Sequence, residues 1–234
     1  MEFLSSLHWG ALLKIIGIDL MLGVDNAIVI ALACAALPAE VRGRAIFWGT
    51  FGAVALRGAL LAVAGFLMGV PYVKLIAGVY LLYLGYKLLT AQEEDHDIPA
   101  HDRMLTAVKT IIVADFMMSL DNVLAVAAAA NDAGAHSTAY AIAGILFSIP
   151  VIVFGAKWLA KLMERFRFIV WFGAGLLGWV GAEMVIADPL LAGSSQFLEP
   201  YHLAFQAAGF LIVVLAAFIG QRMSAKAPDA APAK

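Results

Sequence analysis

Seven long apolar runs divide the chain, and their length limits the fold more than any other feature of the sequence. The hydrocarbon core of a bilayer is about 30 Å thick, so a helix that crosses it needs about 20 mostly apolar residues. Hydrophobic side chains make up 63% of the 234 residues, whereas soluble domains contain about 45–50%. We therefore predict an all-α polytopic membrane protein with seven transmembrane helices. The runs lie approximately at residues 10–36, 44–69, 71–90, 104–130, 138–160, 168–187 and 203–221.

The connections between these runs are short, and none is long enough to form a soluble domain. The sequence therefore predicts a single transmembrane domain over residues 1–222. Residues 223–234 are rich in alanine, proline and lysine, which predicts a disordered C-terminal tail. The net charge is only −2, so the composition indicates no basic field for nucleic acid. The expected partner is the lipid bilayer, and the sequence does not indicate an oligomeric state.

Basic residues in the short connections predict the orientation, because cytoplasmic loops carry an excess of Lys and Arg. With the N-terminus outside and the C-terminus in the cytoplasm, twelve basic residues fall on the cytoplasmic side. Two, Lys14 and Lys74, fall on the outer side, and Arg57 falls in the middle of the second run. The twelve are Arg42, Arg44, Lys87, Arg103, Lys109, Lys157, Lys161, Arg165, Arg167, Arg222, Lys226 and Lys234.

An internal repeat relates the two halves of the chain. The segment "GIDLMLGVDNAIVI" (residues 17–30) returns as "ADFMMSLDNVLAVA" (residues 114–127), and the matching Asp and Asn residues of the two segments are 96 positions apart. Each repeat covers three runs, approximately 10–90 and 104–187, and because three is odd the second copy enters the membrane from the opposite side. We predict two inverted repeats plus a seventh helix at 203–221. Secondary transporters often have this layout, with their sites near the midplane at the repeat interface.

The repeated motif places carboxylates where a bilayer disfavours them. An Asp near the centre of a transmembrane helix costs about 2.5–3.5 kcal/mol, and Arg57 alone cannot neutralise four carboxylates. Carboxylate and amide oxygens suit Mg²⁺, Ca²⁺ or Mn²⁺, which favours a cation site over mere bridging between helices. On a regular first helix Asp25 would lie on the flank, and an interruption at Gly23 would let the motif converge. The motif residues are Asp19, Asp25, Asn26, Asp115, Asp121 and Asn122.

We assign three roles within this set. Asp25 and Asp121, each about midway along its run, are the expected central ligands. Asp19 and Asp115 lie about nine ångströms further along their helices, as additional ligands or relay positions. The two Asn residues supply neutral oxygens or hold the carboxylates.

The paired motifs "DLMLGVDN" and "DFMMSLDN" resemble those of the TerC family of integral membrane proteins, which is similar in architecture to the lysine-exporter superfamily. The resemblance covers nearly the whole chain. It implies a multi-pass protein of the bacterial inner membrane that exports a divalent cation, most often Mn²⁺, from the cytoplasm. It maps the motif onto the six residues given above. No prosthetic group is expected, and the bound ligand is the transported cation.

We expect alternating access, in which the two repeats rock about a midplane site. Two other functions stay open. One is a carrier of a small organic solute, similar to the lysine exporters, and the other is a membrane partner that assists metal loading without transport. No Ser–His or Cys–His constellation lies at depth in the sequence, so we do not expect an enzyme.

Three further features have two interpretations each. Arg57, whose counterpart in the second repeat is Ile152 or Val153, is either a counter-ion that replaces a departing metal or half of a fixed structural ion pair. Glu183 is either a carboxylate on the exit path or a proton carrier, or else a side chain that reaches the membrane interface. The segment "QEEDHDIPAHDR" (residues 92–103) collects cations or is a solvated acidic loop, and the second interpretation is favoured because its ligand spacing is irregular.

Overall fold

The computed structural model describes residues 9–67, 70–90, 99–131, 137–194 and 199–224, and over these ranges the chain is helical and contains no strand. The predicted all-α class is therefore confirmed. The helices are α2 (Trp9–Leu22), α3 (Val24–Ala35), α4 (Ala39–Leu67), α5 (Val73–Thr90), α6 (Ala100–Asn131), α7 (Ser137–Arg165), α8 (Arg167–Ile186) and α10 (His202–Ser224), with short 3₁₀ turns η2 (Pro189–Ser194) and η3 (Glu199–Tyr201). The predicted disordered tail lies almost entirely outside the described residues.

The long helices coincide with the expected runs, with α2 and α3 sharing the first one. By length and hydropathy, four helices of the described chain can each cross a membrane, and the bent pair α2–α3 makes a fifth if it forms one span. The count of seven stays a prediction. The four segments are Val73–Thr90, Ile142–Arg165, Arg167–Ile186 and His202–Met223.

The first run is broken at Gly23. Helix α2 ends at Leu22 and α3 begins at Val24, and the two are bent by 43°. A Cβ atom at Gly23 would lie 2.9 Å from the carbonyl oxygen of Asp19 and 3.2 Å from the Ile152 side chain. Glycine therefore permits both the bend and the close approach of α7, and the first run is interrupted at the residue where an interruption would let the motif converge.

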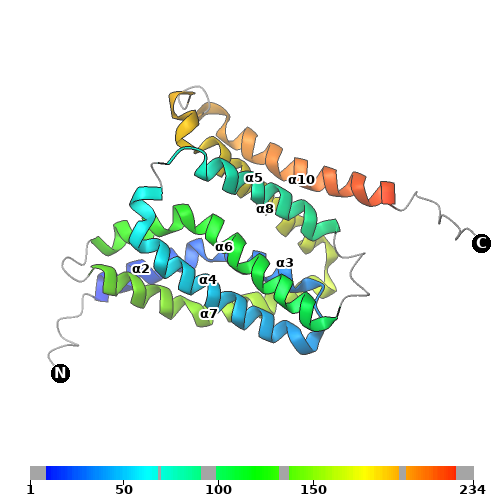
Figure 1. Cartoon of the computed structure of the whole chain (residues 1–234), viewed down its shortest axis with the longest axis horizontal. Coiled ribbons are helices and arrows are strands. Elements are labelled where there is room, and N and C mark those ends of the chain that lie inside the picture. The colour runs from blue at the N-terminus through cyan, green and yellow to red at the C-terminus, as the bar shows by residue number, and fades with distance from the viewer. Residues whose placement is uncertain (1–8, 68–69, 91–98, 132–136, 195–198, 225–234) are drawn as a thin grey trace, which may run out of the picture.

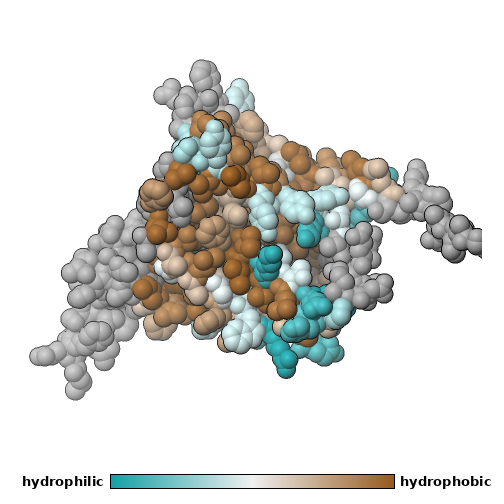
Figure 2. Space-filling model, in the orientation of Figure 1, coloured by the Kyte–Doolittle hydropathy of each residue, from teal (hydrophilic) through white to brown (hydrophobic). Residues whose placement is uncertain are grey.

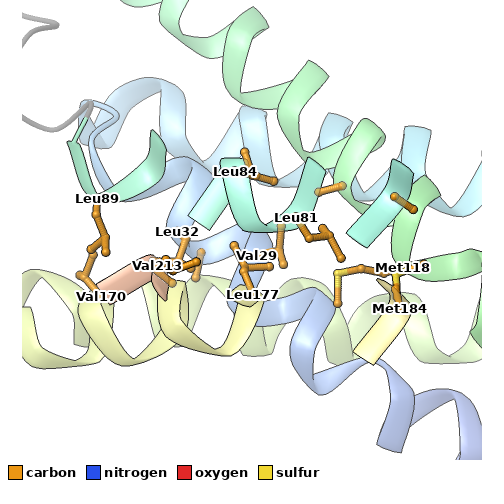
Figure 3. Close-up of a cluster of buried hydrophobic side chains, with 14 of the residues drawn as sticks. Val29, Leu32, Leu81, Leu84, Leu89, Met118, Val170, Leu177, Met184 and Val213 are labelled. Atoms are coloured by element: carbon orange, nitrogen blue, oxygen red, sulfur yellow. The ribbon is translucent and has the colours of Figure 1, made fainter. Parts of the chain in front are cut away.

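The helices form two layers (Figure 1). Helices α5, α8 and α10 make one layer, and α2, α3, α4, α6 and α7 make the other. Within the second layer α4 packs along α6, while α2 and α3 pack along α7. A cluster of buried apolar side chains from α3, α5, α6, α8 and α10 joins the two layers (Figure 3). It includes Val29, Leu32, Leu81, Leu84, Leu89, Met118, Val170, Leu177, Met184 and Val213.

Much of the outer surface is apolar. Figure 2 shows hydrophobic residues over most of one face, with hydrophilic residues gathered toward one end of the bundle. Large side chains such as Phe66 (77% exposed), Phe154 (74%) and Phe168 (69%) point outward. A soluble monomer rarely exposes apolar surface on this scale, so the outer surface is suited to contact with lipid.

Small residues bring the helices of the first layer close together. A Cβ at Gly78 in α5 would collide with the backbone oxygen of Gly181 in α8, and a Cβ at Gly178 would collide with the backbone oxygen of Gly209 in α10. Because apolar side chains gain little by leaving lipid, such close backbone packing is a main source of helix association in membranes.

Replacing Gly78 with Ala is therefore expected to lower the free energy of unfolding by about 1–3 kcal/mol, since the colliding atom is backbone and cannot turn aside. Gly155→Ala is the matched control, because no atom lies within 4 Å of a Cβ built there and Ala favours a helix over Gly by about 1 kcal/mol. Unfolding in detergent measures both. Equal stability of the two variants would contradict the close packing of α5 on α8.

Candidate functional site

The centre of the second layer contains a buried arginine between two carboxylates. Arg57 in α4 donates from one terminal nitrogen to Asp19 Oδ1 in α2 at 3.1 Å and from the other to Asp115 Oδ1 in α6 at 2.5 Å. Its Nε donates to the Ser119 hydroxyl in α6 at 3.0 Å. Arg57, Asp19 and Asp115 are 2%, 0% and 7% exposed. All three nitrogens of the guanidinium are therefore engaged away from water.

Hydroxyl groups satisfy the remaining carboxylate oxygens. Ser119 donates to Asp115 Oδ2 at 3.0 Å, and Ser148 in α7 donates to Asp19 Oδ2. Ser148 also lies 2.8 Å from the carbonyl oxygen of Ile145 in its own helix. Each of the four carboxylate oxygens thus accepts one hydrogen bond, and residues of four helices meet at one point.

The charges of this cluster do not balance. Two carboxylates and one guanidinium give a formal charge of −1 if both acids are ionised. Removing one partner from a buried ion pair costs about 3–5 kcal/mol, while apolar replacement of the whole group is often neutral or stabilising. A buried ionic cluster of this kind therefore adds little to the stability of the fold, so stability alone does not explain its presence. Ionisable residues inside a membrane are by default candidates for a functional site.

Other polar groups of the two motifs are also buried or half-buried. Asn26 in α3 is 2% exposed. Asp25 is half-buried and lies close enough to Arg57 and to Glu183 in α8 for their charges to act on it. Asn122 in α6 is half-buried. Asp25 is therefore within electrostatic reach of both Arg57 in α4 and Glu183 in α8.

The structure thus places the first carboxylate of each motif, Asp19 and Asp115, at the centre of the described network. The sequence analysis assigned that place to Asp25 and Asp121. The backbone of Asp121 belongs to α6, but its side chain lies outside the described set, so its role stays a prediction. Arg57 pairs with motif carboxylates, as both of its interpretations required.

Two hydroxyls of the core had no role in the sequence analysis. One is Ser148, and the other is Thr50 in α4, which is 2% exposed and has no hydrogen-bond partner among the described residues. Thr50 precedes Arg57 by seven residues, about two helical turns, and so lies on the same face of α4. The only signal in the sequence was a small hydroxyl within an apolar run, which is common in packed transmembrane helices.

The donor types suit a hard divalent cation. Carboxylate, hydroxyl and amide oxygens are the ligands of Mg²⁺, Ca²⁺ and Mn²⁺. Among the side chains that the structure describes, no group of three or more His, Cys, Asp or Glu residues stands ready as a metal site. In this structure the cation between the two carboxylates is the guanidinium of Arg57.

The acidic segment at residues 92–103 is only partly described. Its first five acidic and histidine positions lie outside the described residues. His101 and Asp102 belong to the first turn of α6, and both are exposed. An acidic residue in the first turn stabilises a helix through the helix dipole. This role alone accounts for Asp102 without a bound cation.

Asp188 forms a second buried polar centre, which the sequence analysis did not identify. Its carboxylate is 1% exposed and accepts hydrogen bonds from the backbone nitrogens of Tyr72 and Leu75, both at 3.0 Å, and of Leu190 at 2.9 Å. Tyr72 has a left-handed φ of 72°. Asp188 therefore caps the start of α5 from the turn after α8, as an anion at a helix N-terminus does.

The pKa of Asp188 predicts how this cap responds to acid. Burial alone would raise the pKa, but the backbone N–H donors of Leu190, Leu75 and Tyr72 together hold it below its ordinary value of 3.8. Because the folded-state pKa is depressed, the stabilisation is present above the unfolded pKa. It is lost as the pH falls below about 4 and through the folded pKa.

We expect Asp188→Ala to lower the free energy of unfolding at neutral pH by about 1.5–3 kcal/mol, the value of hydrogen bonds to a charged group. The melting temperature of the purified protein measures this. As the pH falls below 4 the difference between wild type and variant should shrink. A difference that stays constant down to the lowest pH would show that the charge of Asp188 has no part in the cap.

Comparison with known proteins gives relatives along most of the chain. A family model described as the integral membrane protein TerC family matches residues 4–225. The chain is 42% identical over 182 residues to the uncharacterized membrane protein YjbE of Bacillus subtilis, covering 78% of this chain and 82% of YjbE. It is 28% identical over 191 residues to the uncharacterized membrane protein YkoY of the same species, covering 75% and 59%.

A more distant relative is the UPF0053 inner membrane protein YoaE of Escherichia coli, with 24% identity over 235 residues. That similarity covers 92% of this chain but 43% of YoaE, so the chain spans less than half of that relative. No solved structure matches the chain.

Proposed function

The chain belongs to the TerC family of integral membrane proteins, and from this premise we propose that it transports a divalent metal cation, with Mn²⁺ as the cargo exported from the cytoplasm. It acts as a carrier in the inner membrane of a bacterium, without a prosthetic group and without an enzymatic reaction. Its N-terminus lies outside and its C-terminus in the cytoplasm.

One observation carries this proposal. Asp19 and Asp115 are equivalent residues of the two motifs, 96 positions apart in the chain, and both contact the same guanidinium in the core. Chance burial of two unrelated acids would not select equivalent positions. A shared site at the interface of two repeats is the arrangement that a transporter with inverted repeats requires.

Contacts elsewhere in the molecule support the inverted repeat. In two cases a glycine of one half lies against a residue of the other half, and the two equivalent residues make the same contact with the halves exchanged. Equivalent residues are 95 or 96 positions apart in the chain. Helices α3 and α6, which belong to equivalent runs, also cross the bundle in opposite directions (Figure 1). The matched contacts are Gly49 with Ile111 and Gly144 with Ile15, and Gly85 with Ala174 and Gly181 with Gly78.

Within this proposal Asp19 and Asp115 are the inner ligand pair. Their burial and their common partner favour them for this role over Asp25 and Asp121, to which the sequence analysis gave it. Asp25 and Asp121 then lie next along the path, and Asn26 and Asn122 supply neutral oxygens. Glu183, which lies near Asp25, is a carboxylate of the path between α3 and α8.

The transport cycle follows from the packing of the second layer. The units differ from the two repeats expected to rock, because each combines helices of both repeats. One unit consists of α4 packed along α6, and the other of α2 and α3 packed along α7. Relative rocking of these two units would open the carboxylate pair to one side of the membrane at a time, over seven spans in total. Alternating access of this kind needs a central site shared by both units.

Flux into proteoliposomes tests the proposal. We expect wild-type protein to move Mn²⁺, and Asp25→Asn and Asp121→Asn to reduce the rate. Lysine added in excess should leave Mn²⁺ flux unchanged. Lysine flux without Mn²⁺ flux would favour a carrier of organic solutes, and the absence of any flux would favour a membrane partner that does not transport.

A further inference from the structure

Arg57 occupies the carboxylate oxygens that a transported cation would need. We propose that its guanidinium is a tethered cation that competes with the divalent ion for Asp19 and Asp115. The ion and the Arg57 guanidinium therefore cannot bind these two carboxylates at the same time. This inference rests on the proposed function. It decides between the two roles of Arg57 that the sequence left open, a fixed structural pair and an exchangeable counter-ion.

Hydrogen-bond geometry supports exclusion. The guanidinium donates to one oxygen of each carboxylate, and Ser148 and Ser119 donate to the other two. A divalent cation of this class needs about six oxygen ligands. It can obtain both carboxylates in the inner shell only when Arg57 withdraws from between them.

Charge supports exclusion independently of geometry. With Arg57 in place, a divalent ion would lie beside a positive guanidinium in a region where the charged side chains are 0–7% exposed. Repulsion between neighbouring charges is much stronger there than in water. With Arg57 withdrawn, two carboxylates face a doubly charged ion and the local charge is balanced.

The position of Arg57 couples this exchange to the bundle. It extends from α4 and joins Asp19 of α2 to Asp115 and Ser119 of α6, while Ser148 of α7 holds the far side of Asp19. Of these contacts, the Arg57–Asp19 ion pair joins one rocking unit to the other, so withdrawal of the guanidinium removes the charged contact between the units at this point.

The repeat has only one such arm. The position equivalent to Arg57 is Ile152 at an offset of 95 residues, or Val153 at an offset of 96. The Ile152 side chain lies against Gly23, and the residue equivalent to Gly23 is Ser119, the partner of Arg57. The same contact between helices is thus apolar in one half and charged in the other. Isoleucine makes this contact by packing alone, so packing between these helices does not require the charge of Arg57.

The withdrawn side chain would still meet negative charge. Asp25 is half-buried and lies within electrostatic reach of Arg57, and Glu183 lies within reach of Asp25, so the guanidinium need not be left in apolar surroundings while the ion is bound.

Equilibrium binding of Mn²⁺ to the purified protein in detergent tests the inference. We expect Arg57→Ala to bind Mn²⁺ at least about tenfold more tightly than wild type, because the competing donor is removed. Arg42→Ala is the matched control. Arg42 also lies in α4 and also pairs with a carboxylate, Glu164 of α7, but at the partly exposed end of the bundle, and its Kd should stay within about twofold of wild type.

Methylguanidinium gives a second readout. Added at millimolar concentration it should compete with Mn²⁺ in Arg57→Ala and have no effect on wild type, where the place is filled by the side chain. Where Arg57→Ala does not fold, Arg57→Lys makes the same comparison. Its ammonium lacks the planar fork that reaches both carboxylates, so its Mn²⁺ Kd should be about threefold tighter than that of wild type.

The outcomes separate the two proposals. Equal or weaker Mn²⁺ binding by the folded Arg57 variants, with binding by wild type, overturns the inference and leaves the proposed function intact. A lack of Mn²⁺ binding by wild type and by every variant overturns both. Tighter binding together with competition by methylguanidinium supports the inference.

Discussion

Replacing Asp115 with Asn is expected to reduce Mn²⁺ flux in proteoliposomes by about 100-fold, the upper end of the loss seen when groups around a metal are removed. The substitution keeps the size of the side chain but removes one of the two charges that the ion would meet. Asp19→Asn should have a similar effect, because the two residues are equivalent in the repeat and share Arg57.

Asp102→Asn provides the control on the same helix. Asp102 is an exposed acid in the first turn of α6, and its replacement should leave the flux within about twofold of wild type, as expected for a weak surface charge. The account would be contradicted if Asp115→Asn and Asp102→Asn had the same flux in equal amounts of folded protein.

The second large effect concerns stability. Replacing Arg57 with Met is expected to lower the free energy of unfolding by about 3–5 kcal/mol, because it leaves two buried carboxylates without a counter-charge. Methionine has a similar length and fills the space without a charge, so the loss reports electrostatics more than packing. Denaturation in mixed micelles in the absence of divalent cations measures it.

A combined variant separates charge from packing. Adding Asp19→Asn and Asp115→Asn to Arg57→Met removes all three charges, and apolar or neutral replacement of a complete buried ion group is often neutral. We expect most of the lost stability to return. If the triple variant is as unstable as Arg57→Met alone, the loss comes from packing around position 57 and the electrostatic account of the cluster is wrong.

The arrangement of helices along the chain could be predicted from hydropathy alone. A helix in lipid satisfies its own backbone groups, so each apolar run of suitable length became a helix, and Gly23 interrupted the first of them. The layering of the helices could not be predicted in the same way. Lipid and protein core are both apolar, so the outward faces, which carry Phe66 and Phe154, resemble the inward faces in composition.

The site was predictable in part for a related reason. Acids in apolar runs are conspicuous, and the repeat alone identifies Asp19 and Asp115 as equivalent positions. The bridge through Arg57 depends on how α4 packs against α2 and α6, and such contacts between distant segments leave no local pattern. Ser148 and Asp188 could not be predicted from the sequence. Many apolar helices contain a single hydroxyl and many turns contain a single acid, and most of these side chains have no special role.

The central claim is that a divalent ion binds between Asp19 and Asp115, and locating manganese in the protein tests it most directly. Crystals or two-dimensional arrays grown with Mn²⁺ would give anomalous scattering at the manganese absorption edge. The account predicts a peak between α2, α4 and α6, within ligand distance of both carboxylates, with the Arg57 guanidinium moved away from them. Manganese bound only at the acidic segment of residues 92–103, with Arg57 still between Asp19 and Asp115, would contradict it.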